Sequence, residues 1–185
     1  MDTSNKSPIF TNPTICAVCH SKNRGCCLSV PEFSDAMFGL TCSEITRITN
    51  ETGLMPESFT TANKAPDAFF KAACRIHPVF GDTMPEQNRI QLKIIDNRCI
   101  FLENDGCRLT DATRPYFCRL YPFWFTPDDD IFVLASDRCL AQENAMSVSE
   151  ILFRLGMKKK ALKALFDDFL ASADDHRKKY FKASP

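Results

Sequence analysis

The sequence predicts an α+β fold, in which a small antiparallel sheet is flanked by N- and C-terminal helices. Its 185 residues are enough for one domain of ordinary size. Capping-box sequences at Thr41 and Ser147 open helical patterns on either side of residues 89–135, where short alternating segments are separated by turn dipeptides. No internal repeat interrupts this order of helix, sheet and helix.

The first 29 residues show neither a helical nor a strand pattern. Residues 1–14 are polar and interrupted by prolines, which predicts a flexible arm. Residues 15–29 are rich in cysteine, and Gly25 with the polar stretch 21–23 predicts a loop. The arm and the loop therefore precede the first predicted helix.

Helices follow the loop. Thr41 and Glu44 form a capping box for a helix through about residue 52, which Gly53 can end. Pro56 suits a first helical turn, and Pro66 begins a further helix that runs to about residue 76. The helical pattern then breaks before residue 89.

The predicted sheet begins with two strands, over 89–97 and 98–104. Asp96-Asn97 is the predicted turn between them, and Asp105-Gly106 is the turn that follows the second. Both strands are bounded by residues that favour tight turns, so we expect short antiparallel pairs.

The second part of the sheet contains a short helical turn. Thr110 or Asp111 is the predicted cap of one turn over 113–118. An aromatic extended segment over 121–125 and a return strand over 131–135 come next, joined by a proline-led acidic turn.

The C-terminal region predicts two helices. Ser147 and Glu150 form a capping box, and the helix behind them reaches Gly156. The last helix presents one apolar face, with lysines on its polar face. The predicted organisation is thus an arm over 1–14, a cysteine-cluster domain over 15–140, and a helical extension over 141–185 packed on it.

Composition argues against several classes of partner. The chain carries 23 basic and 23 acidic residues, so no overall positive charge favours binding to nucleic acid. No stretch approaches the roughly 20 apolar residues of a membrane helix. The polar N-terminus has no apolar signal core, which favours a cytoplasmic location.

Ten cysteines are unusual for a cytoplasmic chain, because a reducing compartment disfavours disulfides. Cys42 and Cys74 each stand alone in an apolar helical segment and suit a structural role, as small buried side chains. The other eight lie in the N-terminal loop or at turns and strand ends of the middle segment: Cys16, Cys19, Cys26, Cys27, Cys99, Cys107, Cys118 and Cys139.

These eight cysteines predict a metal site made by the cysteine loops, with redox-active or inert thiols as the alternatives. The C-x-x-C spacing of Cys16 and Cys19 allows two sulfurs to converge on one ion. Adjacent Cys26 and Cys27 are poorly placed for a single ion, but can serve two sites or two metals of one cluster. Zinc sites and iron–sulfur clusters each take four protein ligands. We expect the metal to tie the N-terminal loop to the middle sheet.

Arginine is the only basic residue type between residues 94 and 157. Four arginines directly neighbour a cysteine in sequence, namely Arg98, Arg108, Arg119 and Arg138, and a guanidinium can offset the negative charge of a thiolate-bound metal. Arg114 and Arg119 flank Cys118 in the R-P-x-x-C-R segment and are the two candidates for binding at the site. They are predicted either to support the metal or to bind an anionic substrate beside it; arginines near turns can also be incidental. His20 is a minor candidate ligand, because it follows Cys19 directly.

The segment CIFLENDGCRLTDATRPYFCRLYPF, together with the upstream CAVC and CC, resembles the YkgJ-like cysteine-cluster family, described as a zinc- or iron-chelating domain. The family pattern of R-P-x-x-C-R-x-Y-P falls on residues 114–122 and the closing cysteine on Cys139. Six residues separate Cys19 from Cys26, more than in the short form of the motif. A similar cysteine arrangement occurs in flagellin lysine N-methylases.

The resemblance implies a metal-binding protein that holds an iron–sulfur cluster or zinc and acts as a redox, assembly or accessory module. Two alternatives stay open: a metal-cluster-dependent, methyltransferase-like enzyme, and a zinc-stapled domain whose lysine-rich C-terminal helix meets a protein partner. No P-loop or glycine-rich cofactor loop supports the enzyme.

Overall fold

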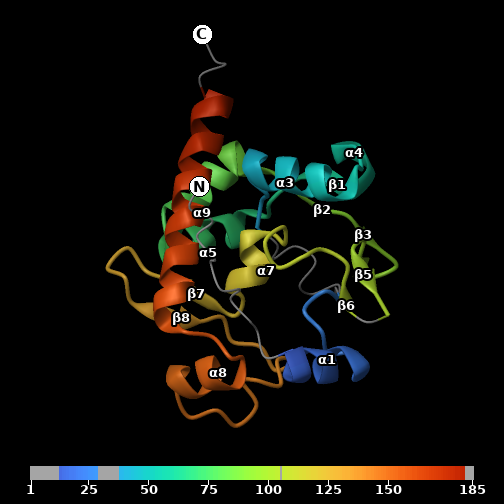
Figure 1. Cartoon of the computed structure of the whole chain (residues 1–185). Helices are drawn as coiled ribbons and strands as arrows, with labels where there is room; N and C mark the ends of the chain where they lie inside the picture. The colour runs from blue at the N-terminus through green and yellow to red at the C-terminus, as the bar shows by residue number, and fades with distance from the viewer. Residues whose placement is uncertain (1–12, 29–37, 105, 182–185) are drawn as a thin grey trace, which may run out of the picture.

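The computed structural model describes residues 13–28, 38–104 and 106–181 (Figure 1). The predicted α+β class is confirmed, with helices around small antiparallel sheets. The strands do not form one sheet; within the described residues they make four separate two-stranded sheets. The predicted arm falls almost wholly outside these residues, as does Asp105 of the second predicted turn.

The predicted loop over 15–29 is wrong in its first half, where the chain forms α1 (Pro13–Ser21). Pro13 suits the first helical position, and no glycine or further proline interrupts the helix. The helix ends where Asn23 adopts a left-handed conformation, with φ of 54°. Cys16 and Cys19 therefore lie one turn apart on a helix.

The capping box of α3 (Cys42–Thr52) is confirmed in full. Thr41 accepts a hydrogen bond from the Glu44 backbone, the Glu44 carboxylate accepts one from the Thr41 backbone, and Gly53 ends the helix with φ of 69°. The helices predicted from Pro56 and Pro66 are also present, as α4 (Pro56–Phe59) and α5 (Asp67–Ile76). Short helices α6 (Val79–Thr83) and η1 (Pro85–Gln87) fill the predicted break.

The first strand of the chain was not predicted. β1 (Thr60–Lys64) pairs antiparallel with β2 (Asn88–Leu92), from Thr60 opposite Leu92 to Lys64 opposite Asn88. Its sequence, TTANK, is polar and mostly exposed, so it lacks the apolar alternation that marks a strand. The predicted strand over 89–97 divides at Lys93, whose backbone N–H donates to Phe59 instead.

The hairpin predicted at Asp96-Asn97 is confirmed. It joins β3 (Ile94–Ile95) to β4 (Arg98–Cys99), and the two turn residues have φ of 49° and 61°. The second predicted strand also divides, since β5 (Leu102–Glu103) pairs with β6 (Gly106–Cys107). These ladders of two residues bring the cysteines of β4 and β6 to short, closely spaced turns.

The helical turn near residue 115 is α7 (Tyr116–Leu120), and its N-cap is Pro115 rather than Thr110 or Asp111. Thr110 is engaged elsewhere, since its backbone N–H and hydroxyl donate to the Glu51 carboxylate at 3.0 and 2.6 Å. The predicted aromatic pair is confirmed as β7 (Phe123–Phe125) and β8 (Ile131–Val133).

The two C-terminal helices are α8 (Val148–Arg154) and α9 (Lys159–Phe181). Ser147 caps α8, but Glu150 accepts from the Met146 backbone, so the reciprocal half of that capping box is not made. The apolar face predicted for α9 is confirmed, because its large apolar residues are buried or partly buried: Leu162, Leu165, Phe166, Phe169 and Leu170.

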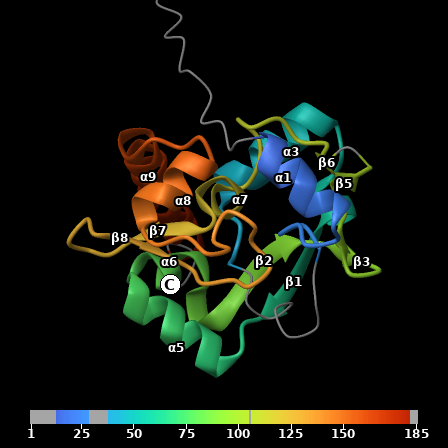
Figure 2. The same ribbon diagram turned by 90° about the horizontal axis from the view of Figure 1, so that it is seen from below.

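α9 packs along α6, α7 and β7 over the larger of two cores (Figures 1 and 2). Trp124, only 1% exposed, is central there, with its ring 4.9 Å from Phe80 and 5.8 Å from Phe169. The smaller core lies under α3 and includes Phe59 and Phe101. No helix in the described parts of the chain combines the length and apolar character needed to cross a membrane.

Candidate metal centre

The cysteine doublet is attached to the middle of the chain by backbone hydrogen bonds. The Cys99 N–H donates to the Cys27 carbonyl at 2.9 Å, and Leu28 forms an antiparallel bridge with Arg98. The N-terminal cysteine loop and the middle segment therefore lie in contact, whereas their predicted connection through a metal stays a prediction. The contact is made by main-chain pairing at β4, which fixes the doublet beside the β3–β4 hairpin.

Five of the predicted cysteines form one thiol group: Cys26, Cys27, Cys99, Cys107 and Cys118. The thiols of Cys26 and Cys27 are hydrogen-bonded to each other. Burial raises the pKa of Cys99 to about 11, and the nearby thiols of Cys107 and Cys26 add to the effect. Burial also raises the pKa of Cys118, followed by the charges of Cys26, Cys99 and Cys107. The thiol of Cys118 therefore lies close to three others.

Cys26 belongs to the same group although the residue as a whole is exposed. The hydrogen bond with Cys27, more than burial, raises the pKa of its thiol. So many neighbouring thiols cannot all ionise together, because each thiolate disfavours the next. A bound cation removes that obstacle, since it stabilises several thiolates at once.

A second, smaller group joins α1 to the turn after β8. Burial raises the pKa of Cys139, and the charge of Cys19 acts in the same direction, so these two thiols are neighbours. Burial also raises the pKa of Tyr121, which the charges of Cys139, Cys26 and Cys19 raise further. Tyr121 therefore lies between the two thiol groups.

Polar contacts hold the turn after β8 against the end of α1. The Arg138 guanidinium donates to the Asn23 carbonyl at 2.9 Å. Arg24 donates to the Asp137 carbonyl and forms an ion pair of 3.4 Å with Glu143. Segments more than 110 residues apart in sequence are thus fixed side by side.

The remaining cysteines are Cys16, which the sequence predicts as a ligand, and Cys42 and Cys74, which it predicts as structural. Cys16 is exposed on α1, one turn before Cys19. Cys42 lies at the start of α3, with its sulfur 3.3 Å from Nδ1 of His176 on α9. Cys74 is in the larger core, where burial and then the charge of Asp82 raise its pKa. Neither Cys42 nor Cys74 is among the residues that influence the two thiol groups.

The two predicted arginines have different surroundings. Arg114 is hydrogen-bonded to the Cys107 thiol, and it also donates to the Leu109 carbonyl at 3.2 Å and pairs with Asp111 at 3.1 Å. Arg119 instead lies over the Tyr116 ring, with its guanidinium carbon 5.8 Å from the ring centroid. Only Arg114 therefore makes a direct contact with a predicted thiol ligand.

Arg47, which the sequence did not mark, lies over the same Tyr116 ring at 4.7 Å. Its Nε and Nη2 atoms are buried and have no hydrogen-bond partner among the residues the structure describes. Burial and the positive charge of Arg47 lower the pKa of Arg119. The two guanidiniums are therefore close neighbours at the Tyr116 ring.

Glu44 is the main residue near the thiols that sequence reasoning missed. Its carboxylate accepts from the Tyr116 backbone N–H at 2.6 Å, in addition to the capping-box bonds from Thr41. It thus links the start of α3 to the first turn of α7, which carries Cys118. A capping box already accounts for a glutamate at this position, so the sequence holds no separate signal of the second contact.

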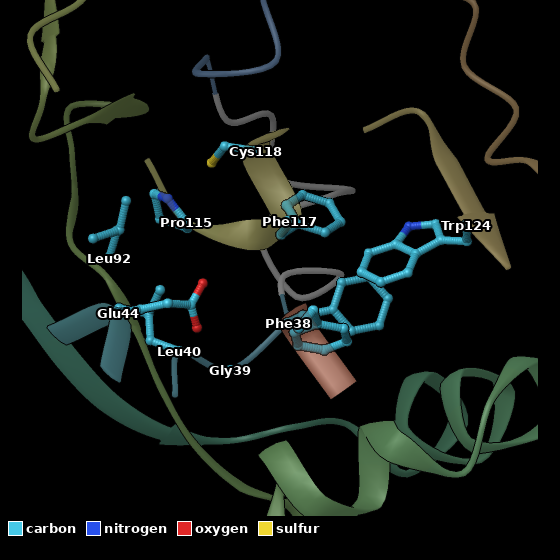
Figure 3. Close-up of a pocket in the computed structure, with 10 residues that line it drawn as sticks. Phe38, Gly39, Leu40, Glu44, Leu92, Pro115, Phe117, Cys118 and Trp124 are labelled. Carbon is cyan, nitrogen blue, oxygen red and sulfur yellow. The ribbon is translucent and has the colours of Figure 1, made fainter. Parts of the chain in front are cut away.

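Glu44 and Cys118 border one small cavity between the two cores (Figure 3). Its volume is about 20 Å³, enough for roughly one water molecule. Burial raises the pKa of Glu44, although the hydrogen bonds from Thr41 and Tyr116 act against the shift. The cavity is too small for an organic substrate.

Searches of protein-family models, curated proteins and solved structures find no match to this chain. Within the described residues, no three His, Cys, Asp or Glu side chains are already arranged around a common metal position. The chemistry of the donors nevertheless fits a metal that prefers sulfur: five thiols, a guanidinium that contacts one of them, and a backbone N–H of Phe101 directed at Cys99.

Proposed function

We propose that this protein binds zinc or an iron–sulfur cluster through four thiolates and acts as a redox, assembly or accessory module. The proposed ligands are Cys26, Cys99, Cys107 and Cys118. The proposal is supported by the main-chain pairing that holds the doublet against β4, where the Cys99 N–H donates to the Cys27 carbonyl at 2.9 Å. The raised pKa of Cys118, caused by burial and by the charges of Cys26, Cys99 and Cys107, is consistent with this placement.

The number of thiols suits both metals. Structural zinc and the common iron–sulfur clusters each take four protein ligands. The four proposed ligands come from four segments, namely the doublet loop, β4, β6 and α7. A metal bound there would join these segments, and its binding free energy would add to the stability of the fold.

Charge balance also supports the site. Four thiolates around Zn²⁺, or around a cluster with two positive charges, leave a net charge of about −2. The guanidinium of Arg114, in contact with Cys107 and held by Asp111, offsets part of this charge. Zinc bound at this position would supply a structural cross-link, whereas an iron–sulfur cluster would supply one-electron transfer.

The resemblance to the YkgJ-like family points in the same direction, because its motif contains all four proposed ligands. Cys27, adjacent to Cys26 and hydrogen-bonded to it, would not bind the metal itself but would help to orient the Cys26 thiolate. We expect it to be less sensitive to replacement than Cys26.

Anaerobic purification followed by metal analysis tests the proposal. A brown protein with absorption near 400 nm and iron with acid-labile sulfide would identify a cluster, and a colourless protein with stoichiometric zinc would identify a zinc site. Full-length protein that contains neither metal, and takes up neither after reduction and reconstitution, would refute the proposal.

A further inference from the structure

Because α1 is a helix and not a loop, His20 becomes a stronger candidate for a metal ligand than the sequence predicts. Residues 16, 19 and 20 are spaced i, i+3 and i+4, and together they span roughly 100° of an α-helix. In the loop that the sequence predicts, adjacent side chains at 19 and 20 would diverge. On the helix, Cys16, Cys19 and His20 share one face.

The hydrogen bond of His20 fixes which ring nitrogen carries the proton. Its Nε2 lies 3.1 Å from the Asn104 carbonyl oxygen, which can only accept, so Nε2 is the donor. Nδ1 is then the nitrogen with a free lone pair. This atom is buried and has no hydrogen-bond partner in the part of the chain that the structure describes.

This arrangement is typical of a metal-binding histidine. Such residues usually donate the second ring N–H to a backbone carbonyl or a carboxylate, which orients the ring and leaves the other nitrogen for the metal. A buried ring nitrogen without a partner is otherwise unfavourable, since burial of an unpaired polar atom costs free energy.

Cys139 brings a further thiol close to α1. It is a neighbour of Cys19, and the contacts of Arg24 and Arg138 hold its turn against the end of the helix. Backbone N–H groups of Ala141 and Gln142 are directed at its sulfur, as is common around metal-bound thiolates.

We propose that α1 and the turn after β8 form a second metal site with three thiolates and one imidazole. The ligands are Cys16, Cys19, His20 through Nδ1, and Cys139. The set matches the Cys₃His type of structural zinc site, and its soft donors favour zinc over magnesium or calcium. The site extends the proposed function to a second ion, but it shares no ligand with the four-thiolate centre.

Cobalt(II) titration of the reduced, metal-free full-length protein tests this site, because d–d and thiolate charge-transfer bands report the ligands directly. We expect two equivalents to bind to the wild type. His20→Ala should weaken binding of one equivalent by about tenfold or more, and Cys139→Ser should do the same. His77→Ala is the matched control: its Nδ1 accepts from the Val79 backbone, and it should bind both equivalents.

The His20→Cys variant shows whether weaker cobalt binding in His20→Ala reflects loss of a ligand or loss of folding. It should keep two equivalents and show stronger thiolate-to-cobalt charge transfer, because one imidazole becomes a fourth thiolate. Unchanged affinity and spectra in both His20→Ala and Cys139→Ser would overturn the second site. One wild-type equivalent that is lost in Cys118→Ser would refute the second site alone. No cobalt binding in the wild type would also refute the second site, whereas the four-thiolate centre is tested separately by the iron, sulfide and zinc analysis above.

Discussion

Replacement of Glu44 by glutamine is expected to destabilise the protein and to loosen the helix that carries Cys118. The carboxylate has two oxygens with separate tasks: Oε2 accepts from the Thr41 N–H and hydroxyl at 2.6 and 2.8 Å, and Oε1 accepts from the Tyr116 N–H at 2.6 Å. Glutamine keeps one oxygen and turns the other position into a donor. One buried backbone N–H therefore loses its acceptor in either orientation of the amide.

The size of the effect follows from two opposing contributions. A buried donor left without a partner costs about 1–3 kcal/mol, and a hydrogen bond to a charged acceptor contributes more to stability than one to a neutral acceptor. Against this, glutamine avoids burial of a carboxylate, which is the main cause of the raised pKa of Glu44. We expect the free energy of unfolding to fall by about 1–3 kcal/mol, or Tm by about 2–10 °C.

Urea denaturation followed by the fluorescence of Trp124, the single tryptophan, measures this change. Glu150→Gln is the matched control, because Glu150 also occupies the third position of a capped helix but is far more exposed than Glu44. Its replacement should have the smaller effect. Glu44→Gln should also lower the metal content, since α7 carries a proposed ligand. An unfolding free energy equal to that of Glu150→Gln, or higher than wild type, would refute the reasoning.

Three further outcomes are expected. Arg114→Lys should lower metal content more than Arg119→Lys, because only Arg114 contacts a thiol; equal losses would contradict this. Arg47→Met should leave the free energy of unfolding unchanged or raise it by up to about 2 kcal/mol, because it removes two buried guanidinium donors that have no partner among the described residues. A fall of more than about 2 kcal/mol would show that the contact of Arg47 with the Tyr116 ring outweighs the cost of burying those donors. Burial lowers the pKa of His176, and the positive charge of Lys179 adds to the effect. The unfolded chain, in which histidine has its ordinary pKa of about 6.5, therefore binds more protons than the folded protein as the pH drops through that value. The free energy of unfolding falls over the same pH range. His176→Asn, which keeps an acceptor for the Cys42 N–H, should reduce the difference in urea midpoint between about pH 7.5 and 5.5; an equal difference would contradict it.

Several sequence signals that act over a few residues predicted the secondary structure correctly. Thr41, Gly53 and the Asp96-Asn97 turn act through their own backbone and immediate neighbours, so the helix and hairpin they mark were predicted correctly. The apolar face of α9 was also readable, because its spacing repeats over several turns.

The errors came from long-range pairing and from one strong assumption. β1 is polar, so only its partner β2 makes it a strand. The sequence predicts a loop where α1 forms, because Gly25 and the polar residues 21–23 argue against regular structure, although Pro13 and the absence of glycine up to residue 21 favour a helix. The loop prediction also made His20 a minor candidate ligand, because adjacent side chains such as those of Cys19 and His20 diverge in a loop.

The cysteines show the same limit. Sequence spacing separated Cys42 and Cys74 from the other eight, and neither contributes to the two thiol groups. Spacing held no information on which cysteines meet, because the Cys19–Cys139 and Cys26–Cys118 proximities depend on folding of the whole chain. The neighbours of Cys118 are set by α7, whose position rests on Glu44 and on packing against α9.

The central claim is that the thiols around Cys118 bind metal, and metal content per chain in Cys118→Ser tests it most directly. Cys74→Ser is the matched control, since Cys74 is also partly buried but lies in the larger core. Anaerobically purified wild type and Cys74→Ser should carry the same amount of iron or zinc, and Cys118→Ser should lose the four-thiolate share of it. Equal metal content in all three proteins would contradict the account.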